Sequence, residues 1–188
     1  MIVGYKGLST MCDTNAVMLD STDLYPDGTV VLAGMETLGQ KRIDQALLYG
    51  AALTCATGGT LRYVFENVIQ NQRGMLPRVE NNSYVDNAGI VGWVRGQRVL
   101  IGNRELLKQY SVVQPEEALE QGLKKNQRAV FLAVDTRPVA MITLEYHPDK
   151  KLAENLQNLE TNGVSLLVRT LDPNLTADFL AQQYDLDA

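Results

Sequence analysis

Residues 87–103 decide the fold, and they read Asn-Ala-Gly-Ile-Val-Gly-Trp-Val-Arg-Gly-Gln-Arg-Val-Leu-Ile-Gly-Asn. Two apolar runs, Gly89–Val94 and Arg98–Ile101, are separated by a short connection that contains Gly96. Apolar runs joined in this way predict a β-hairpin. Gly102 and Asn103 end the second strand. The middle of the chain is therefore expected to contain an antiparallel sheet.

The segments on either side of this hairpin predict further elements of the same unit. Apolar spacing and turn residues give the following expectations: a strand at 29–32, helices at 40–54 and 61–69, a surface loop at 73–82, helices at 104–110 and 115–125, and a second hairpin of strands 129–134 and 139–144.

The two ends of the chain carry a different pattern. Ala16–Leu19 and Val164–Val168 are almost purely apolar, which is typical of buried strands in a parallel sheet. Leu152, Leu156 and Leu159 recur at helical spacing, and the helix closes at Gly163. Asp172 and Pro173 are expected to be the N-cap and first residue of a last helix.

These patterns predict an α/β protein with an α+β insertion. Residues 1–24 and 145–188 are expected to form a partial Rossmann-like domain around the two apolar strands. Residues 25–144 are expected to form the inserted domain, an antiparallel sheet with flanking helices.

Composition excludes several classes of function. There are 17 Lys and Arg against 22 Asp and Glu, a net charge of −5, and no basic run exceeds two residues, so no nucleic-acid partner is expected. Cys12, Cys55 and the single histidine, His147, are too few for a Cys-rich or multi-His metal site. No apolar stretch approaches the roughly 20 residues of a membrane span, and no secretory leader is expected.

The first candidate for chemistry is Asp20, which follows the apolar run at 16–19. A carboxylate at the C-terminal end of a parallel strand lies where ligands bind in open α/β sheets. It can accept a phosphoryl group as a nucleophile, and Thr22 supplies a nearby hydroxyl. The alternative is that Asp20 only starts a turn, as Asp often does.

Thr170 and Asp172 form the second candidate, after the other apolar strand. A hydroxyl at Thr170 is suited to a phosphate oxygen near a helix start. Asp172, taken alone, is more readily explained as a helix cap than as a catalytic group.

The third candidate lies in the hairpin, where Gly89 allows the backbone to approach a ligand closely. Hairpins use glycine for turns just as often, so this pattern alone is weak.

Together these segments resemble the cytoplasmic part of a P-type ATPase, and most closely its heavy-metal-transporting branch. The phosphorylation motif D-K-T-G-T-L-T is similar to residues 20–26, Asp-Ser-Thr-Asp-Leu-Tyr-Pro, which keep Asp20 and Thr22. The nucleotide-domain motif G-x-G-V-x-G-x-V-x-G-x-x-V-L-x-G-N is similar to residues 87–103, with Asn87 in place of the first Gly. The T-G-D motif is similar to Thr170-Leu171-Asp172.

The resemblance implies a nucleotide-binding domain inserted into a haloacid-dehalogenase-type phosphorylation domain. It assigns catalytic roles to Asp20, Thr22, Thr170 and Asp172, and nucleotide binding to the four residues Asn87, Gly89, Gly102 and Asn103. It further implies a parent membrane protein that uses ATP and Mg²⁺ to transport cations. This chain would be a soluble piece of that protein on the cytoplasmic face, attached through flanking membrane segments.

The departures from the family's motifs argue against catalytic activity and tight ATP binding. Ser21 replaces the Lys, Leu171 replaces the Gly of T-G-D, and no His-Pro pair stands near Gly59. The family's later Lys and its G-D-G-x-N-D motif are also missing. We therefore expect this chain alone to be inactive and to bind ATP weakly or not at all.

Three functions remain open at this point. The chain is part of an active transport ATPase, or it is a catalytically decayed domain that acts as a binding or regulatory module. A stand-alone phosphatase of the haloacid dehalogenase type is the least favoured, because its Lys and paired-Asp motifs are missing.

Overall fold

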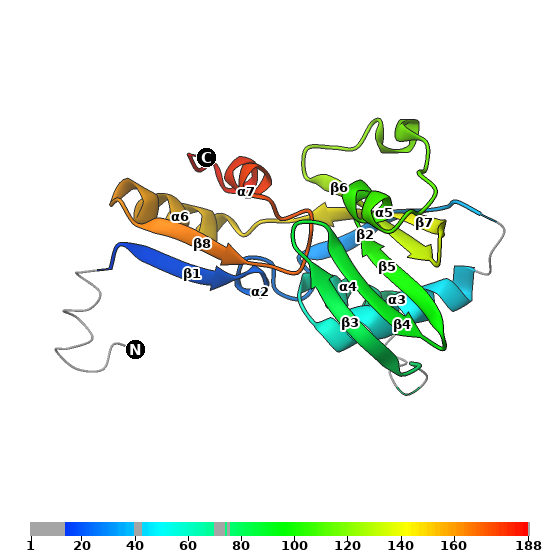
Figure 1. The fold of residues 1–188 in the computed structure, drawn as a ribbon. Helices are drawn as coiled ribbons and strands as arrows, with labels where there is room; N and C mark the ends of the chain where they lie inside the picture. Colours follow the sequence, from blue (N-terminus) through cyan, green and yellow to red (C-terminus); the bar gives the residue numbers. More distant parts are fainter. Residues whose placement is uncertain (1–13, 40–42, 70–73, 75, 188) are drawn as a thin grey trace.

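The computed structural model describes residues 14–39, 43–69, 74 and 76–187, and it contains two sheets (Figure 1). β1 (Ala16–Asp20) and β8 (Ser165–Arg169) form a parallel pair. The other six strands form an antiparallel sheet in the order β2-β7-β6-β5-β4-β3. The mixed α/β fold with an antiparallel sheet between the parallel strands in sequence is therefore confirmed.

The elements of the antiparallel part occupy the middle of the chain. Its strands are β2 (Val30–Thr37), β3 (Val79–Val85), β4 (Gly89–Val94), β5 (Gln97–Gly102), β6 (Gln127–Val134) and β7 (Arg137–Tyr146). Its helices are α3 (Ile43–Thr57), α4 (Thr60–Val68), α5 (Arg104–Gln109) and the 3₁₀ turn η2 (Glu117–Glu120). Both predicted hairpins are confirmed as β4–β5 and β6–β7.

Three helices accompany the parallel pair. They are α2 (Ser21–Leu24), α6 (Lys150–Thr161) and α7 (Ala177–Tyr184), and in Figure 1 they lie with β1 and β8 at the end of the molecule opposite α3 and β4.

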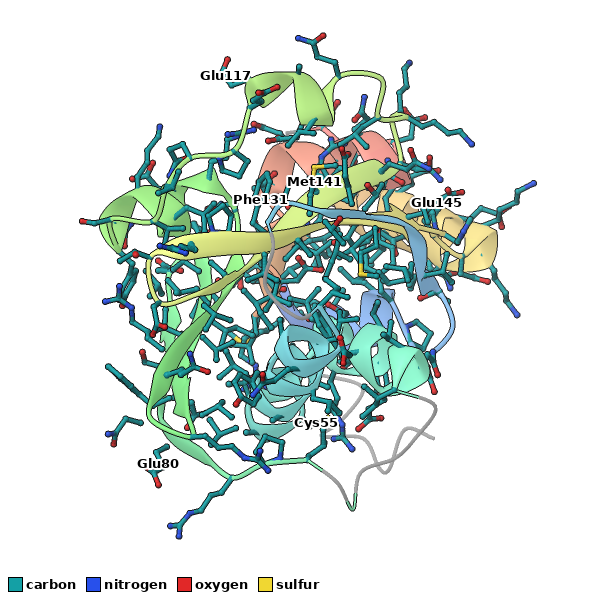
Figure 2. All side chains as sticks on the ribbon, turned by 90° about the vertical axis from the view of Figure 1, so that its right-hand side faces the viewer. Cys55, Glu80, Glu117, Phe131, Met141 and Glu145 are labelled. Atoms are coloured by element: carbon teal, nitrogen blue, oxygen red, sulfur yellow. The ribbon has the colours of Figure 1, made fainter. Side chains whose placement is uncertain are left out.

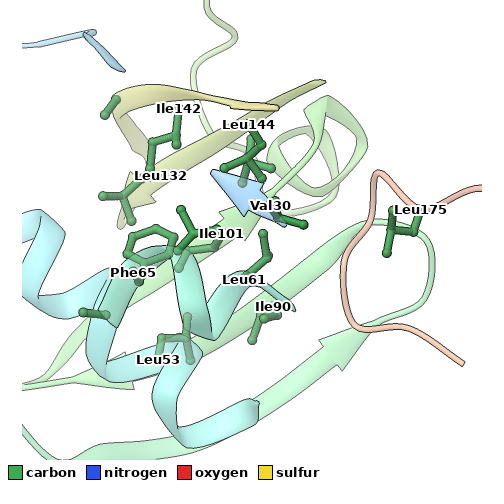
Figure 3. Close-up of a cluster of buried hydrophobic side chains, with 14 of the residues drawn as sticks. Val30, Leu53, Leu61, Phe65, Ile90, Ile101, Leu132, Ile142, Leu144 and Leu175 are labelled. Atoms are coloured by element: carbon green, nitrogen blue, oxygen red, sulfur yellow. The ribbon is translucent and has the colours of Figure 1, made fainter. Parts of the chain in front are cut away.

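One face of the antiparallel sheet packs against α3 and α4. Figure 3 shows this core, in which Leu53, Leu61 and Phe65 from the helices meet Ile101 and Leu132 from the strands. All five side chains are buried. On α4 the apolar residues recur at three- and four-residue spacing and so share one face, whereas α3 buries every residue from Tyr49 to Thr54.

The opposite face of the same sheet carries a second, smaller core. Strand neighbours alternate between faces, so Leu100 packs with Leu106 of α5 while Ile101 faces the first core. Phe131 of β6 is paired with Met141 of β7 in this second core (Figure 2), and the guanidinium carbon of Arg104 lies 5.1 Å from the Phe131 ring centroid.

A buried aromatic cluster joins the parallel and antiparallel parts. The ring centroid of Tyr25 lies 5.4 Å from that of Tyr146 and 5.9 Å from that of Tyr184. Phe179 packs edge-on against Tyr146 at 5.1 Å. The two connections between the parts run side by side, since His147 N–H donates to the Thr29 carbonyl at 2.8 Å.

The prediction that both end strands are buried was wrong. Met18 of β1 is 70% exposed and Leu167 of β8 is 50% exposed. Helices cover only one face of this two-stranded sheet, where Leu19 and Val168 pack against the core. The apolar runs therefore supply one covered face and one open face.

The predicted helix at 115–125 is also wrong, because only η2 forms there. Arg104 donates to the carbonyls of Pro115 at 2.7 Å and Glu116 at 2.9 Å, and it pairs with the Glu120 carboxylate. In an α-helix the Glu116 carbonyl would accept the N–H of residue 120. The arginine binds this carbonyl instead, and Leu119 N–H reaches it only in a 3₁₀ turn at 3.4 Å.

Several boundaries were misplaced, and the strand predicted at 29–32 extends as β2 to Thr37. The segment predicted as a loop at 73–82 contains the start of β3, a polar and largely exposed edge strand that pairs with β4. The helix predicted at 40–54 begins in the described residues at Ile43 and continues to Thr57, and residues 40–42 lie outside those described. Thr54 and Thr57 belong to this last part of the helix, and their hydroxyls donate to carbonyls one turn back.

Asp172 is not a helix cap, contrary to the prediction. The last helix begins four residues later, where Thr176 is the N-cap and its hydroxyl oxygen accepts the Phe179 N–H at 3.3 Å. The Asp172 carboxylate binds groups from distant elements, and its Oδ1 holds a turn by accepting the Asn174 N–H at 3.0 Å. Hydrogen bonds from residues distant in sequence therefore decide the role of Asp172, and they outweigh its preference for a helix N-cap.

Candidate functional site

Asp20 lies at the C-terminal end of β1, directly beside Arg169 of β8. Arg169 donates from Nε at 3.1 Å and from Nη2 at 2.8 Å to the same carboxylate oxygen, Oδ2. This hydrogen bond with Arg169 is the main reason that the pKa of Asp20 lies below its usual value of 3.8. Asp20 is therefore ionised at neutral pH, which is the state that a nucleophile requires.

Thr22 fixes the other oxygen of the same carboxylate. Oδ1 of Asp20 accepts the Thr22 N–H at 3.1 Å and the Thr22 hydroxyl at 2.9 Å. The Asp23 carboxylate in turn accepts the Asp20 N–H at 2.9 Å, which completes a capping box on α2. The alternative interpretation, in which Asp20 starts a turn, is thus confirmed as a local role. That role orients the carboxylate at the strand end.

A small pocket opens beside Asp20. Its volume is about 350 Å³, and its lining residues are Asp20, Ser21, Thr57, Gly59, Arg169, Thr170 and Leu171. The fold therefore brings Asp20 and Thr170 to one cavity. Thr22 contacts Asp20 from outside this lining, and Asp172 does not line it either.

Thr170 and Leu171 shape the far side of the pocket. The Thr170 hydroxyl accepts the Asp172 N–H at 2.9 Å, so it braces the loop after β8. Leu171 packs at the start of α4, where a Cβ on Gly59 would lie 3.4 Å from the Leu171 Cβ. The bulky residue in place of the family's glycine thus narrows the space between the two parts of the chain.

Asp172 lies deeper, in a buried hydrogen-bond network between the two parts. Its Oδ2 accepts the Tyr146 hydroxyl at 2.7 Å and the Thr60 hydroxyl at 3.2 Å. Asn174 also donates its side-chain amide to the Tyr146 oxygen at 3.3 Å. Burial raises the pKa of Asp172 above its usual 3.8, against the opposing effect of these hydrogen bonds. The arrangement joins β7, α4 and the loop after β8.

The four predicted nucleotide-binding residues do come together, at the open end of the β4–β5 hairpin. Gly89 pairs with Gly102, and Asn103 donates its side-chain amide to the Asn87 carbonyl at 2.8 Å. A Cβ on Gly89 would lie 2.2 Å from the Ile101 carbonyl oxygen, and one on Gly102 would lie 2.1 Å from that of Ala88. Both glycines are therefore required by the close approach of two backbones.

A larger groove links the hairpin to the Asp20 pocket. It has a volume of about 1140 Å³ and runs along α6, α7 and β8. Asn87 lines one part of it, and Arg169, Thr170 and Leu171 line both this groove and the smaller pocket. Of the four predicted nucleotide-binding residues, Asn87 is the one in its lining.

Sequence reasoning missed Arg169 and Tyr146. The signal for Arg169 was its position, since it directly follows an apolar strand and, in register, faces the residue that ends the other one. Nothing in the local sequence marks Tyr146, because its partners Thr60 and Asp172 are distant along the chain.

The residues around Asp20 do not by themselves fit a Mg²⁺ ion. Among the described residues, no group of three or more His, Cys, Asp or Glu side chains is placed to hold a metal. The carboxylates nearest the pocket, Asp20 and Asp23, are already bound by Arg169, by Thr22 and by a backbone N–H. Mg²⁺ needs near-octahedral oxygen ligands, of which substrate phosphates usually supply several.

The sequence of the chain is similar to those of metal-exporting P-type ATPases. It is 25% identical over 183 residues to a copper-exporting P-type ATPase of Legionella pneumophila and 22% identical over 189 residues to a silver-exporting P-type ATPase of Salmonella typhimurium. These alignments cover 96% and 100% of this chain but 25% and 23% of the relatives. The chain thus spans about a quarter of the length of these curated relatives. No protein-family profile matches it.

Solved structures of domains from metal-transporting ATPases share the fold of this chain. The catalytic domain of the CPx-ATPase CopB-B, studied for its changes on nucleotide binding, matches all of this chain with a TM-score of 0.59 at 11% identity, over 64% of its own length. The N-domain of HMA6, a copper-transporting P-type ATPase, matches over its whole length and 63% of this chain, with a TM-score of 0.50 at 17% identity.

The resemblance to the cytoplasmic region of heavy-metal P-type ATPases is confirmed by these matches. Within the described parts of the chain, the helices are too short or too polar to cross a membrane.

Proposed function

We propose that this chain is the nucleotide-binding-like domain, together with part of the phosphorylation domain, of a heavy-metal P-type ATPase. In this proposal residues 25–144 form the first domain, and residues 1–24 with 145–188 form the second, of haloacid dehalogenase type. The HMA6 N-domain supports this division, since it matches 63% of the chain and residues 25–144 are 120 of 188, or about 64%.

The observation that carries the proposal is the position of Asp20. It is an ionised carboxylate at the C-terminal end of a parallel strand, beside a pocket that it shares with Thr170. Those two residues are 150 positions apart, yet they lie at the same edge of one small sheet. Ligands bind at this edge in open α/β sheets.

The chemistry proposed for this carboxylate is phosphoryl transfer. A carboxylate oxygen of Asp20 forms a bond to the terminal phosphorus of ATP, while the bond from that phosphorus to its bridging oxygen breaks. ADP leaves with the electron pair of the broken bond, and water later hydrolyses the aspartyl phosphate. Thr22 holds the carboxylate in place, and Thr170 braces the loop that forms the opposite wall.

ATP is proposed to lie between the hairpin end and this pocket. The groove that reaches from Asn87 to Thr170 supports this placement. Asn87, Gly89, Gly102 and Asn103 form the proposed nucleotide end, and Asp172 holds the two parts together. Mg²⁺ belongs to the proposal for the parent protein by resemblance, and in that protein it would neutralise phosphate charge.

The parent protein is proposed to be an integral membrane transporter of cations, with this chain on the cytoplasmic face. The test uses the full-length gene product in sealed membrane vesicles, with copper or silver ions supplied outside. ATP-dependent metal uptake that is lost in Asp20→Asn supports the proposal. Uptake that persists in this variant contradicts it.

A second function is a binding or regulatory module in which catalysis has decayed. Ser21 in place of the family's Lys and the packing of Leu171 against Gly59 favour it. Each missing contact to ATP weakens binding about tenfold or more. Calorimetry of the chain with ATP tests this loss of contacts: micromolar affinity would refute the expectation that binding by the chain alone is weak.

A further inference from the structure

The Asp20 pocket is electrically balanced by a residue from the other strand. Asp20 and Arg169 are the two charged side chains among its lining residues. Ser21, which stands where the resemblance expects a lysine, is buried and brings no charge. The positive charge of this site therefore comes from β8.

This ion pair is exposed and so is easily opened. The side chain of Arg169 is 76% exposed and that of Asp20 is 32% exposed. Both residues lie on the open face of the two-stranded sheet, the face that also carries Met18 and Leu167. Water screens a pair of this kind, and exposed ion pairs contribute little to stability.

The pair also engages the carboxylate proposed as the nucleophile. Thr22 donates to Oδ1 and Arg169 donates to Oδ2, so both oxygens accept hydrogen bonds while these partners stay in place. Thr22 belongs to α2 and binds Oδ1 through both its backbone N–H and its hydroxyl. Arg169 is the more exposed partner, with 76% of its side chain open to solvent, and its guanidinium donates hydrogen bonds to Asp20.

We propose that Arg169 is the charge-neutralising group of this pocket and that its guanidinium moves from the Asp20 carboxylate onto the oxygens of a phosphoryl-sized dianion. The proposal rests on the proposed function of Asp20. Arginine suits both partners, since its planar N–H groups match carboxylate and phosphate geometry alike. Ser21, Thr57 and Thr170 add hydroxyls to the pocket lining, and the Thr57 hydroxyl also donates to the Leu53 carbonyl at 3.0 Å.

The probe is inorganic orthophosphate, titrated into the 188-residue chain at neutral pH without ATP. Binding is followed by NMR at the Arg169 Nε–H group and at the backbone amides of Ser21, Thr57 and Thr170. In the natural chain, phosphate must compete with the Asp20 carboxylate for the arginine and is also repelled by Asp23. Asp20→Asn removes this competitor, and we expect phosphate to bind about tenfold more tightly in that variant.

A double variant assigns the gain to the arginine. In Asp20→Asn with Arg169→Gln, the added affinity should disappear, whereas Asp20→Asn with Arg62→Gln should retain it. Arg62 is a matched control because it forms an ion pair of the same 2.8 Å length, with Glu66 on α4. Equal phosphate affinity in the two double variants overturns the proposal, as does no gain in Asp20→Asn.

A second readout does not depend on phosphate. Arg169→Gln should raise the pKa of Asp20 toward 3.8, measured from the carboxyl ¹³C shift, and Arg169→Lys should restore part of the shift. An unchanged pKa in Arg169→Gln overturns the proposal. The proposed function fails separately: if the full-length protein forms no phosphoenzyme, these measurements on the chain still stand.

Discussion

The Tyr146 hydroxyl donates to the Asp172 carboxylate at 2.7 Å, and both residues are buried where the two parts of the chain meet. Tyr146 ends β7, while Asp172 follows β8. One hydrogen bond therefore ties the antiparallel sheet to the loop that forms the candidate site. The stability of this junction and the geometry of the Asp20 pocket are expected to depend on each other.

Tyr146→Phe is expected to lower the free energy of unfolding by about 1–3 kcal/mol, the range for a buried polar group left without its hydrogen bond. The variant removes the donor to Asp172 and the acceptor of the Asn174 amide, and it leaves the ring packing against Tyr25 and Phe179 in place. Urea denaturation measures the change. Tyr63→Phe is the control, since that residue is only partly buried on α4; an equal loss in both variants would contradict the role of the network.

Asp172 should make stability fall as pH rises. Burial raises its pKa in the folded state above 3.8, so the folded protein binds this proton more tightly than the unfolded chain. The stabilisation is complete below pH 3.8 and is lost as pH rises through the higher, folded-state pKa. The difference in unfolding free energy between the natural chain and Asp172→Asn should shrink over that window.

Asp20 should behave in the opposite sense. Arg169 lowers its pKa, so its contribution to stability is present above pH 3.8 and is lost as pH falls through the lower, folded-state value. Urea titrations of Asp20→Asn and Asp172→Asn at a series of pH values compare the two directions. The same pH dependence in both variants would contradict these assignments.

Gly89→Ala and Gly102→Ala are each expected to destabilise the chain by more than about 3 kcal/mol or to prevent folding. The new methyl group would lie 2.2 Å and 2.1 Å, respectively, from a backbone carbonyl oxygen, and Gly89 also has a φ of +140°. Gly34→Ala is the matched control in the same sheet, because its Cβ would lie 3.9 Å from Thr143. Equal melting temperatures for all three variants would refute this account of the hairpin.

The open face of the parallel pair is expected to promote self-association. Met18→Thr with Leu167→Thr changes two exposed apolar side chains, so unfolding free energy should move by no more than about 0.5 kcal/mol. Sedimentation velocity at rising concentration should show less association in the double variant than in the natural chain. Equal association would mean that this face is not involved.

Local pattern predicted much of the fold, and two of its failures share one physical cause. The hairpin at 89–102 and the helix closed by Gly163 follow from periodicity and turn residues, and both are confirmed. Asp172 was misassigned because Tyr146 and Thr60, which bind it, are 26 and 112 residues away in sequence. The helix expected after Pro115 does not form for a similar reason, because Arg104, 11 residues before Pro115, binds the Pro115 carbonyl.

In the candidate site too, local pattern predicted the positions that follow the strands but not the contacts between strands. Asp20 and Thr170 were predictable, since each follows an apolar strand, and the pairing of the strands brings them to one pocket. The partnership of Asp20 with Arg169 depends on strand register, which the sequence of either strand alone does not specify.

Phosphoenzyme formation by the full-length gene product tests the role of Asp20 most directly. The protein is incubated with Mg²⁺ and ATP labelled at the terminal phosphate, quenched in acid and treated with hydroxylamine, which cleaves acyl phosphates. We expect a hydroxylamine-sensitive label in the natural protein, formed slowly because Ser21 replaces the family's Lys, and no label in Asp20→Asn. A sensitive label that persists in Asp20→Asn, or no label in either protein, would contradict the assignment of Asp20 as the phosphoryl acceptor.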